Sequence, residues 1–218
     1  MAVPALERLR VSEIFPSLQG ESSRSGMPTV FVRLTGCPLR CSWCDTAYAF
    51  EGGKSMSIDD VLASVHDHGI DTVCVTGGEP LAQKPCLELL RRLCDAAYRV
   101  SLETSGALDI AGVDPRVLRV IDVKAPGSGE SDKNRWANLA QLKADDELKF
   151  VLADADDYRW AKAVIAEHDL GSRCNILFSP VWGALEPRAL ADWIVRDRLP
   201  VRMQLQLHKL LWGEVAGR

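Results

Sequence analysis

Short apolar segments alternate with segments of helical period along most of this chain. The apolar segments are rich in Val, Ile and Leu and are short enough to be buried strands. They span residues 29–34, 72–76, 100–103, 117–122, 147–152, 175–178 and 201–207. Amphipathic helical patterns occupy residues 58–68, 85–97, 156–168 and 187–198. A strand followed by a helix, repeated along the chain, predicts an α/β fold with a mostly parallel sheet.

Polar residues and glycines gather where the predicted strands end. They lie at residues 76–80, 103–106, 122–124, 179–180 and 208–209. An open doubly wound sheet and a partial TIM-like barrel both contain right-handed crossovers, so periodicity does not separate them. A barrel, however, collects the ends of its strands around one mouth. We therefore predict a partial TIM-like barrel, built as a single domain over residues 1–218.

Composition narrows the classes of protein to which this chain can belong. Its 218 residues, 47% of them hydrophobic, suffice for one sizeable core. The 26 Lys and Arg against 30 Asp and Glu give a net charge of −4, which offers no electrostatic reason to bind nucleic acid or an acidic membrane. The N-terminus lacks an apolar signal segment, and no apolar run reaches the roughly 18 residues of a membrane span. These features predict a cytoplasmic protein that acts on a small molecule.

Three of the seven cysteines, Cys37, Cys41 and Cys44, lie close together in a loop. Their spacing brings three thiolates to one side of a single turn of chain. A four-iron cluster is usually held by four thiolates, so this triplet would leave one iron open to a further ligand. Zinc is the alternative, although a structural zinc site needs a fourth ligand, for which His66 and His68 are the nearest candidates. The triplet therefore favours an iron–sulfur cluster that takes part in chemistry.

The segment after the strand at 72–76 combines two glycines with a proline. Gly77 and Gly78 permit a positive φ or a close approach of the backbone to a ligand, and Pro80 restricts Glu79 to an extended conformation. The extended backbone of Glu79 could accept a hydrogen bond from the ammonium group of an amino-acid ligand on the open iron. An ordinary turn between a strand and a helix is the alternative.

Charged residues in or beside the predicted strands are candidates for ligand contacts. Arg33 lies within an apolar strand, where a buried guanidinium needs a carboxylate from Glu21, Glu103 or a substrate. Glu103 ends another strand, and Gln19 and Glu21 lie in a predicted polar turn over residues 15–22. The alternatives are a solvated loop for residues 15–22, a surface-facing position on an edge strand for Arg33, and a helix cap or turn for Glu103. For His208, which follows the last predicted strand, the alternative to a ligand contact is a local hydrogen bond.

These motifs resemble those of a known family. The spacing of Cys37, Cys41 and Cys44 is similar to the signature of the radical S-adenosylmethionine (SAM) enzymes, and residues 77–80 resemble their second motif. Within that superfamily, the chain resembles the 7-carboxy-7-deazaguanine synthases of the queuosine pathway. The similar segments are residues 12–21, 31–34, 43–46, 101–106 and 206–209. The resemblance implies a single radical SAM domain with a modified TIM-like barrel.

The resemblance also implies a reaction. In this family SAM binds the open iron through its amino and carboxylate groups, and an electron from the reduced cluster cleaves its carbon–sulfur bond. The resulting 5′-deoxyadenosyl radical abstracts hydrogen from 6-carboxy-5,6,7,8-tetrahydropterin, whose ring contracts with loss of ammonia. SAM is regenerated. The implied enzyme is a carbon–nitrogen lyase that uses Mg²⁺, receives electrons from a flavodoxin or ferredoxin and is a homodimer.

Individual residue roles follow from the same resemblance. It implies pterin contacts by Gln19, Glu21, Arg33, Gly78, Glu103 and His208, with Glu21, Arg33, Glu103 and His208 as the catalytic candidates. The cofactor-side candidates are Gly77, Gly78, Glu79, Ser105, Lys124 and Ser179. The cysteine triplet would hold a 4Fe–4S cluster, and Thr46 would ligate Mg²⁺. Lys124 could equally form an ion pair with Asp122 at the strand end, and Leu207 replaces the threonine that usually precedes the family histidine.

Two other functions remain open at this point. An activase that installs a glycyl radical in a protein partner shares the cysteine motif and a similar size, but its substrate is a polypeptide. The turn at residues 19–21 and the inward Arg33 favour a small anionic substrate instead. An iron–sulfur electron carrier without enzymatic activity is the second alternative, and it would not bind SAM.

Overall fold

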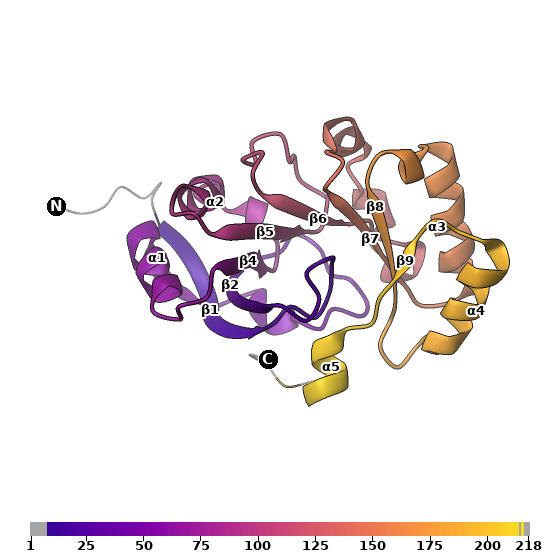
Figure 1. The fold of residues 1–218 in the computed structure, drawn as a ribbon, viewed down its shortest axis with the longest axis horizontal. Helices are drawn as coiled ribbons and strands as arrows, with labels where there is room; N and C mark the ends of the chain where they lie inside the picture. Colours follow the sequence, from indigo (N-terminus) through magenta and orange to yellow (C-terminus); the bar gives the residue numbers. More distant parts are fainter. Residues whose placement is uncertain (1–7, 214, 216–218) are drawn as a thin grey trace.

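One mixed sheet runs through the computed structural model, which describes residues 8–213 and 215 (Figure 1). Its strands are β1 (Arg8–Leu18), β2 (Pro28–Leu34), β3 (Lys54–Ser57), β4 (Thr72–Gly77), β5 (Arg99–Thr104), β6 (Leu118–Asp122), β7 (Glu147–Leu152), β8 (Asn175–Pro180) and β9 (Arg202–Met203). Their spatial order is β3-β1-β2-β4-β5-β6-β7-β8-β9. From β2 to β9 neighbouring strands pair in parallel, whereas β1 pairs antiparallel with both β2 and β3. The sheet is therefore mostly parallel and unclosed, as predicted for a partial barrel.

The helices α1 to α4 occur where the helical patterns predict them. The α-helices are α1 (Ile58–His66), α2 (Cys86–Asp95), α3 (Ala155–Glu167), α4 (Pro187–Asp197) and α5 (Leu207–Trp212). Ser57 and Asp60 form a capping box at the start of α1, and the Asp154 side chain accepts two backbone hydrogen bonds at the start of α3. Between β6 and β7 the chain instead forms three short 3-10 segments. None of the helices in the described residues is long and apolar enough to cross a membrane.

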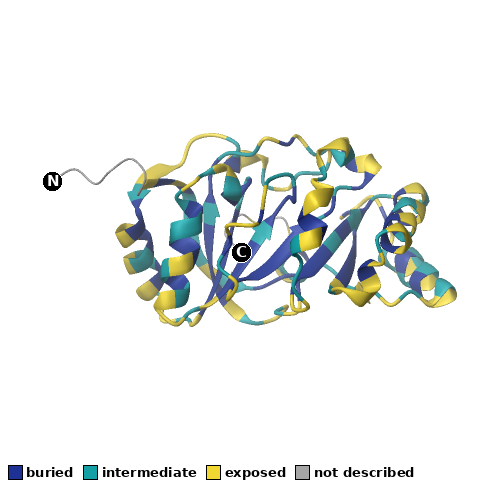
Figure 2. Cartoon of the chain, turned by 90° about the horizontal axis from the view of Figure 1, so that it is seen from above, coloured by how far each residue is buried: buried dark blue, intermediate teal, exposed yellow. Residues whose placement is uncertain are grey.

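Alternate residues of each strand face opposite sides of the sheet. On β2, Val32 joins the hydrophobic core, whereas Arg33 lines a cavity on the other side. On β7, Phe150 joins the same core, and its neighbour Lys149 lines the same cavity. The apolar faces of α1 to α4 complete this core, so the strands are buried and the outer sides of the helices are exposed (Figure 2). The sheet thus separates an apolar face from a polar one.

The sequence analysis predicts no strand before residue 29 and so misses β1 (Arg8–Leu18) altogether. β1 extends through residues 15–18, where the sequence predicts part of a polar turn. The ring of Phe15 stacks on Phe31 of β2, with centroids 5.3 Å apart. β1 lies near the edge of the sheet and is mostly half-exposed, so its sequence lacks the continuous apolar run of a buried parallel strand.

The predicted strand at residues 201–207 is also wrong in extent. Only Arg202 and Met203 belong to β9, although the backbone N–H of Gln204 still donates to the Phe178 carbonyl (2.9 Å). The chain then leaves the sheet, and the N–H of Leu207 donates to the Gly20 carbonyl (3.0 Å) where α5 begins. A hydrogen bond to the β1–β2 loop therefore ends the pairing with β8 and brings α5 to the polar face.

Candidate active site

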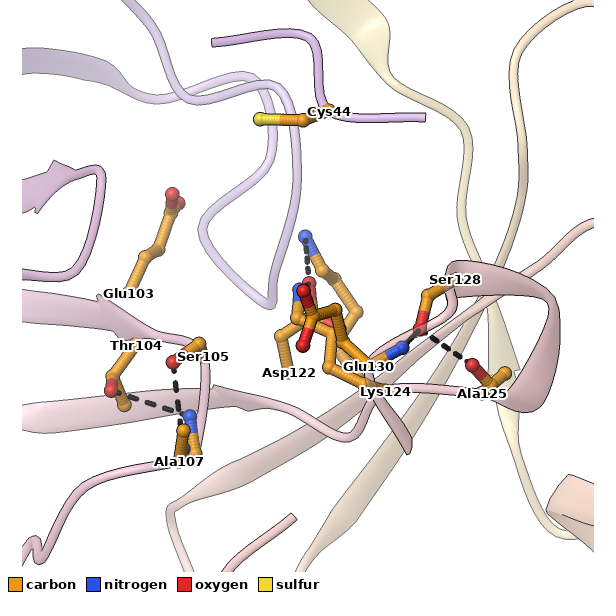
Figure 3. A network of polar contacts seen from close by, with 12 residues as sticks. Cys44, Glu103, Thr104, Ser105, Ala107, Asp122, Lys124, Ala125, Ser128 and Glu130 are labelled. Atoms are coloured by element: carbon orange, nitrogen blue, oxygen red, sulfur yellow. Dashed lines mark hydrogen bonds and ion pairs between the residues drawn. The ribbon is translucent and has the colours of Figure 1, made fainter. Parts of the chain in front are cut away.

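A cavity of about 700 Å³ opens on the polar face of the sheet. Strands β2, β4, β5, β6 and β7 contribute to its wall, together with the cysteine loop, the β1–β2 loop and α5. Figure 3 shows Glu103, Asp122 and Lys124 at neighbouring strand ends, on the far side of the space from the loop that carries Cys44. Strand ends do meet at one mouth, as the barrel prediction requires.

Most residues predicted for the site line this cavity. They are Gln19, Glu21, Arg33, Cys37, Cys41, Cys44, Thr46, Gly77, Gly78, Glu103, Ser105, Lys124 and His208. Glu79 and Ser179 do not, because they lie behind the wall with exposed fractions of 0% and 1%. The structure therefore brings together residues that are far apart in the sequence and leaves two predicted cofactor contacts outside the cavity surface.

The cysteine loop is held by the turn at residues 125–130. The backbone N–H of Ser42 donates to the Ser128 carbonyl (3.0 Å), and its hydroxyl donates to the Gly127 carbonyl (2.8 Å). The turn is itself braced by the Ser128 hydroxyl, which donates to the Ala125 carbonyl (2.6 Å) and accepts from the N–H of Glu130 (Figure 3). These bonds fix the path of the loop between its second and third cysteines.

The three thiols suit an iron–sulfur cluster in both position and chemistry. All three line one cavity, and burial raises the pKa of Cys37 and Cys41, so iron must displace their protons on binding. No three Cys, His, Asp or Glu side chains within residues 8–213 and 215 converge tightly enough to hold a single ion. In a cluster, by contrast, each thiolate binds a different iron.

Gly77 and Gly78 allow two backbone segments to approach closely. Gly77 has a φ of +148°, and a Cβ atom there would lie 2.1 Å from the Leu34 carbonyl oxygen. A Cβ on Gly78 would lie 2.2 Å from the Gly36 carbonyl oxygen and 3.0 Å from Cys37 Cβ. Gly77 is therefore required by the packing of β4 against the end of β2, and Gly78 by its approach to the start of the cysteine loop; both also line the cavity.

Glu79 adopts the extended backbone conformation that Pro80 predicts, with φ −130° and ψ 106°. Its buried carboxylate accepts hydrogen bonds from the N–H of Leu81 (2.9 Å), the Thr104 hydroxyl (2.9 Å) and the N–H of Ser105 (2.7 Å). The side chain thus joins the end of β4 to the end of β5. Any contact with the cofactor is left to the backbone of Glu79.

The partner of Arg33 is neither of the two carboxylates that the sequence suggests. Its Nε lies 2.6 Å from Oε1 of Glu13 on β1, and the Tyr48 hydroxyl donates to the same oxygen (2.8 Å). The sequence analysis missed Glu13 because it predicted no strand at the position of β1. Glu103 instead accepts from Nε2 of Gln19 (3.2 Å) and from the Thr76 hydroxyl (3.0 Å).

Asp122 and Lys124 form the ion pair that the sequence left as an alternative. Lys124 Nζ lies 3.0 Å from Asp122 Oδ2, and both residues line the cavity. Burial opposes the charge on Lys124, but the attraction of Asp122 outweighs it and raises the lysine pKa. In the described part of the chain, Asp122 Oδ1 is buried without a hydrogen-bond partner. The ion-pair and cavity-lining interpretations of Lys124 are therefore compatible.

His208 reaches the cavity because Gly20 has no side chain. A Cβ on Gly20 would lie 2.0 Å from His208 Nδ1, so any larger residue would displace the imidazole. Asp45 of the cysteine loop receives Lys209 Nζ (3.2 Å) and Gln206 Nε2 (3.3 Å), which ties α5 across the mouth. Burial lowers the pKa of His208, although the nearby carboxylates of Glu21 and Asp45 act in the opposite direction.

The sequence matches proteins of one function over most of its length. Residues 31–123 match the Radical SAM superfamily. A 7-carboxy-7-deazaguanine synthase of Chlorobaculum tepidum is 51% identical over 208 residues, which cover 94% of each chain. A protein of the same name from Koribacter versatilis is 41% identical and covers 94% of this chain and 97% of its own. The chain belongs to the 7-carboxy-7-deazaguanine synthase family.

Fold comparison agrees with this family. The crystal structure of QueE from Escherichia coli superposes with a TM-score of 0.77, covering 92% of this chain and 95% of the other, at 24% sequence identity. Membership in a radical SAM family confirms a 4Fe–4S cluster and SAM as the cofactors, in place of the zinc alternative. His66 and His68, the candidates for a fourth zinc ligand, do not line the cavity.

The sequence analysis did not identify several residues that form this site. Besides Glu13, they include Thr76, Tyr48 and Lys149, of which all three line the cavity. A signal existed for Lys149, because it is a charged residue inside an apolar strand, as Arg33 is. Thr76 belongs to the polar group at residues 76–80, but a threonine at a strand end does not by itself indicate a ligand contact, and a tyrosine in a loop, such as Tyr48, carries no comparable signal.

Proposed function

We propose that this chain converts 6-carboxy-5,6,7,8-tetrahydropterin into 7-carboxy-7-deazaguanine with loss of ammonia. The observation that carries the proposal is the convergence of the cysteine triplet with Arg33 and Glu103 on one cavity. The names of the full-length relatives support the same product. They favour this function over the glycyl-radical activase and the electron carrier, because all of the curated relatives reported above carry the name of a deazaguanine synthase.

Residues on the substrate side of the cavity match the groups of this pterin. Glu13 engages Nε of Arg33, so the terminal nitrogens of the guanidinium are the donors for a substrate carboxylate. Glu21 and Glu103 accept hydrogen bonds from the N–H groups of the aminopyrimidinone edge. Gln19 donates to Glu103 and holds that carboxylate in place (3.2 Å). His208 closes the site from α5, and the absence of a side chain at Gly20 makes room for it.

On the other side, the cysteine loop and the end of β4 receive the cofactors. When bound, the reduced cluster and SAM supply the radical that begins the reaction. The backbone of residues 77–79 lies against the cysteine loop, where it can accept a hydrogen bond from an ammonium group. Lys124 and Asp122 offer charged contacts at the adjoining strand ends, where Ser105 also lines the cavity while its hydroxyl donates to Glu79. α5 adds His208 and Lys209 to the lining of the same cavity.

Mg²⁺ is part of the same proposal. Thr46 lines the cavity, and its hydroxyl donates to Asp45 Oδ1 (3.2 Å). A hydroxyl beside a carboxylate offers the hard oxygen ligands that Mg²⁺ prefers. The metal held there would neutralise the substrate carboxylate and complement Arg33 in binding it.

The remaining properties are proposed from the resemblance and from the composition of the chain. They are carbon–nitrogen lyase chemistry, a homodimeric state, an electron supply from flavodoxin or ferredoxin, and a cytoplasmic location. The terminal carboxylate, which contacts substrate in some family members, lies outside the described residues.

The decisive experiment is anaerobic turnover. The cluster is reconstituted in the full chain, and reductant, SAM, Mg²⁺ and the carboxylated pterin are added. The proposal predicts 7-carboxy-7-deazaguanine by mass, over several turnovers per SAM consumed. Formation of 5′-deoxyadenosine without a deazapurine would leave the radical chemistry intact and overturn the substrate.

A further inference from the structure

Lys149 is a half-buried cation on the polar face of the sheet, and the resemblance assigns it no role. It extends from β7 into the cavity, and its side chain is 12% exposed. Its Nζ lies 2.5 Å from Glu21 Oε2 and 3.7 Å from Asp122 Oδ2. Burial opposes its charge, but Glu21, Asp122 and Glu103 together raise its pKa, so the lysine is an ammonium.

The lysine belongs to a set of contacts that hold the β1–β2 loop across the sheet. Three strands separate β2 from β7 in the sheet, yet the loop between β1 and β2 reaches β7. The N–H of Ser22 donates to Gln204 Oε1 (2.8 Å), and the N–H of Ser23 donates to Glu147 Oε1 (2.9 Å). Of these three contacts, the one made by Lys149 is to a side chain of the loop, that of Glu21.

The two oxygens of the Glu21 carboxylate have different surroundings. Within the described residues, the side-chain hydrogen bond from Lys149 goes to Oε2, which leaves Oε1 for a ligand. The same ammonium attracts Asp122, which pairs with Lys124 beside the cysteine loop. A neutral residue at 149 would leave Asp122 with Lys124 alone and would remove the cation beside Glu21, so Glu21 would lose both its charge balance and its fixed orientation.

We propose that Lys149 is a positioning residue, which fixes Glu21 for the pterin edge and joins it to the Asp122–Lys124 pair on the cofactor side. This inference rests on the proposed function, because it takes Glu21 to contact the pterin. It predicts that Lys149 affects pterin binding through Glu21 and not independently of it.

The test is a double-mutant cycle on pterin binding to the reconstituted full chain. Binding of 6-carboxytetrahydropterin, in the presence of SAM but without reductant, is measured by anaerobic equilibrium dialysis. Lys149→Met and Glu21→Gln should each raise the Kd about 10-fold, the loss expected for a charged hydrogen bond. The double variant should bind no more weakly than the weaker single variant. Lys149→Arg, which keeps the charge, should recover part of the affinity.

Lys143→Met controls for loss of stability. Lys143 Nζ donates to the backbone carbonyls of Pro115 and Val117 outside the cavity, so this variant should lower the Tm without changing the pterin Kd. An unchanged Kd in Lys149→Met, or losses that add fully in the double variant, would overturn the positioning role while the wild-type Kd still supports the proposed function. If the wild-type chain binds no pterin, the proposed function and this inference are both overturned.

Discussion

Neighbouring residues of the same strands serve two regions with different requirements. On the helix-covered face Phe150 is fully buried among aromatic rings, whereas the adjacent Lys149 carries a charge into the cavity. Arg33 and Val32 show the same contrast on β2. The apolar face under the helices, called here the outer face, is stabilised by burial of apolar area. The polar face that lines the cavity, called here the inner face, is stabilised by compensation of charges. Substitutions on the two faces should therefore fail in different ways, the first in stability and the second in chemistry.

Loss of one cysteine should have the largest effect on the inner face. Cys41→Ala removes one of three thiolates, so the reconstituted protein should lose the cluster, cofactor cleavage and all turnover. Iron content and 5′-deoxyadenosine formation measure this directly. Cys86→Ala is the matched control, because Cys86 is fully buried in the hydrophobic core. This variant should be less stable but should keep its full iron content. Full iron content and turnover in Cys41→Ala would remove this cysteine from the cluster.

On the outer face, Phe150→Ala should destabilise the fold and spare the chemistry. The ring packs on Phe178 and Trp160 with centroids 5.6 and 6.3 Å apart. Its removal leaves a cavity and should cost about 3–5 kcal/mol in the free energy of unfolding. Denaturant unfolding measures this loss, and the pterin Kd of the folded fraction should stay unchanged. A weakened Kd with unchanged stability would contradict the division between the faces.

The sequence predicts these two faces unequally, for a physical reason. Continuous apolar runs mark the parallel strands, so the outer core and most strand bounds follow from periodicity. The inner face depends on pairs such as Arg33 with Glu13 and Lys149 with Glu21, which lie 20 and 128 residues apart. A charge inside an apolar strand indicates that a partner exists. Which strand or loop provides that partner depends on the folded structure, so Glu13 on β1 and the pairing of Lys149 with Glu21 were missed.

Arg33→Ala tests the inner face by removing its anchoring cation. The pterin carboxylate would lose a charged, partly buried partner, which should weaken binding by ~1–3 kcal/mol and raise KM accordingly. Steady-state kinetics at saturating SAM measure the change. Arg92→Ala is the control, since Arg92 pairs with Asp59 on the exposed helical surface and should leave KM unaltered. An unchanged KM in Arg33→Ala would show that the arginine only supports Glu13 and Tyr48.

Thr46→Ala should have the smallest effect, because it removes one oxygen and no charge from the inner face. If Thr46 ligates Mg²⁺, the concentration of Mg²⁺ for half-maximal rate should rise on the order of 10-fold, as losses near a bound metal do. Thr46→Ser keeps the hydroxyl and should restore the wild-type titration. Both variants should keep their iron, since Thr46 is not one of the three cysteine ligands and its Oγ1 lies 4.0 Å from Cys44 Sγ. An identical Mg²⁺ titration in Thr46→Ala would place the metal elsewhere, and the anionic substrate would then depend on Arg33 for most of its charge compensation.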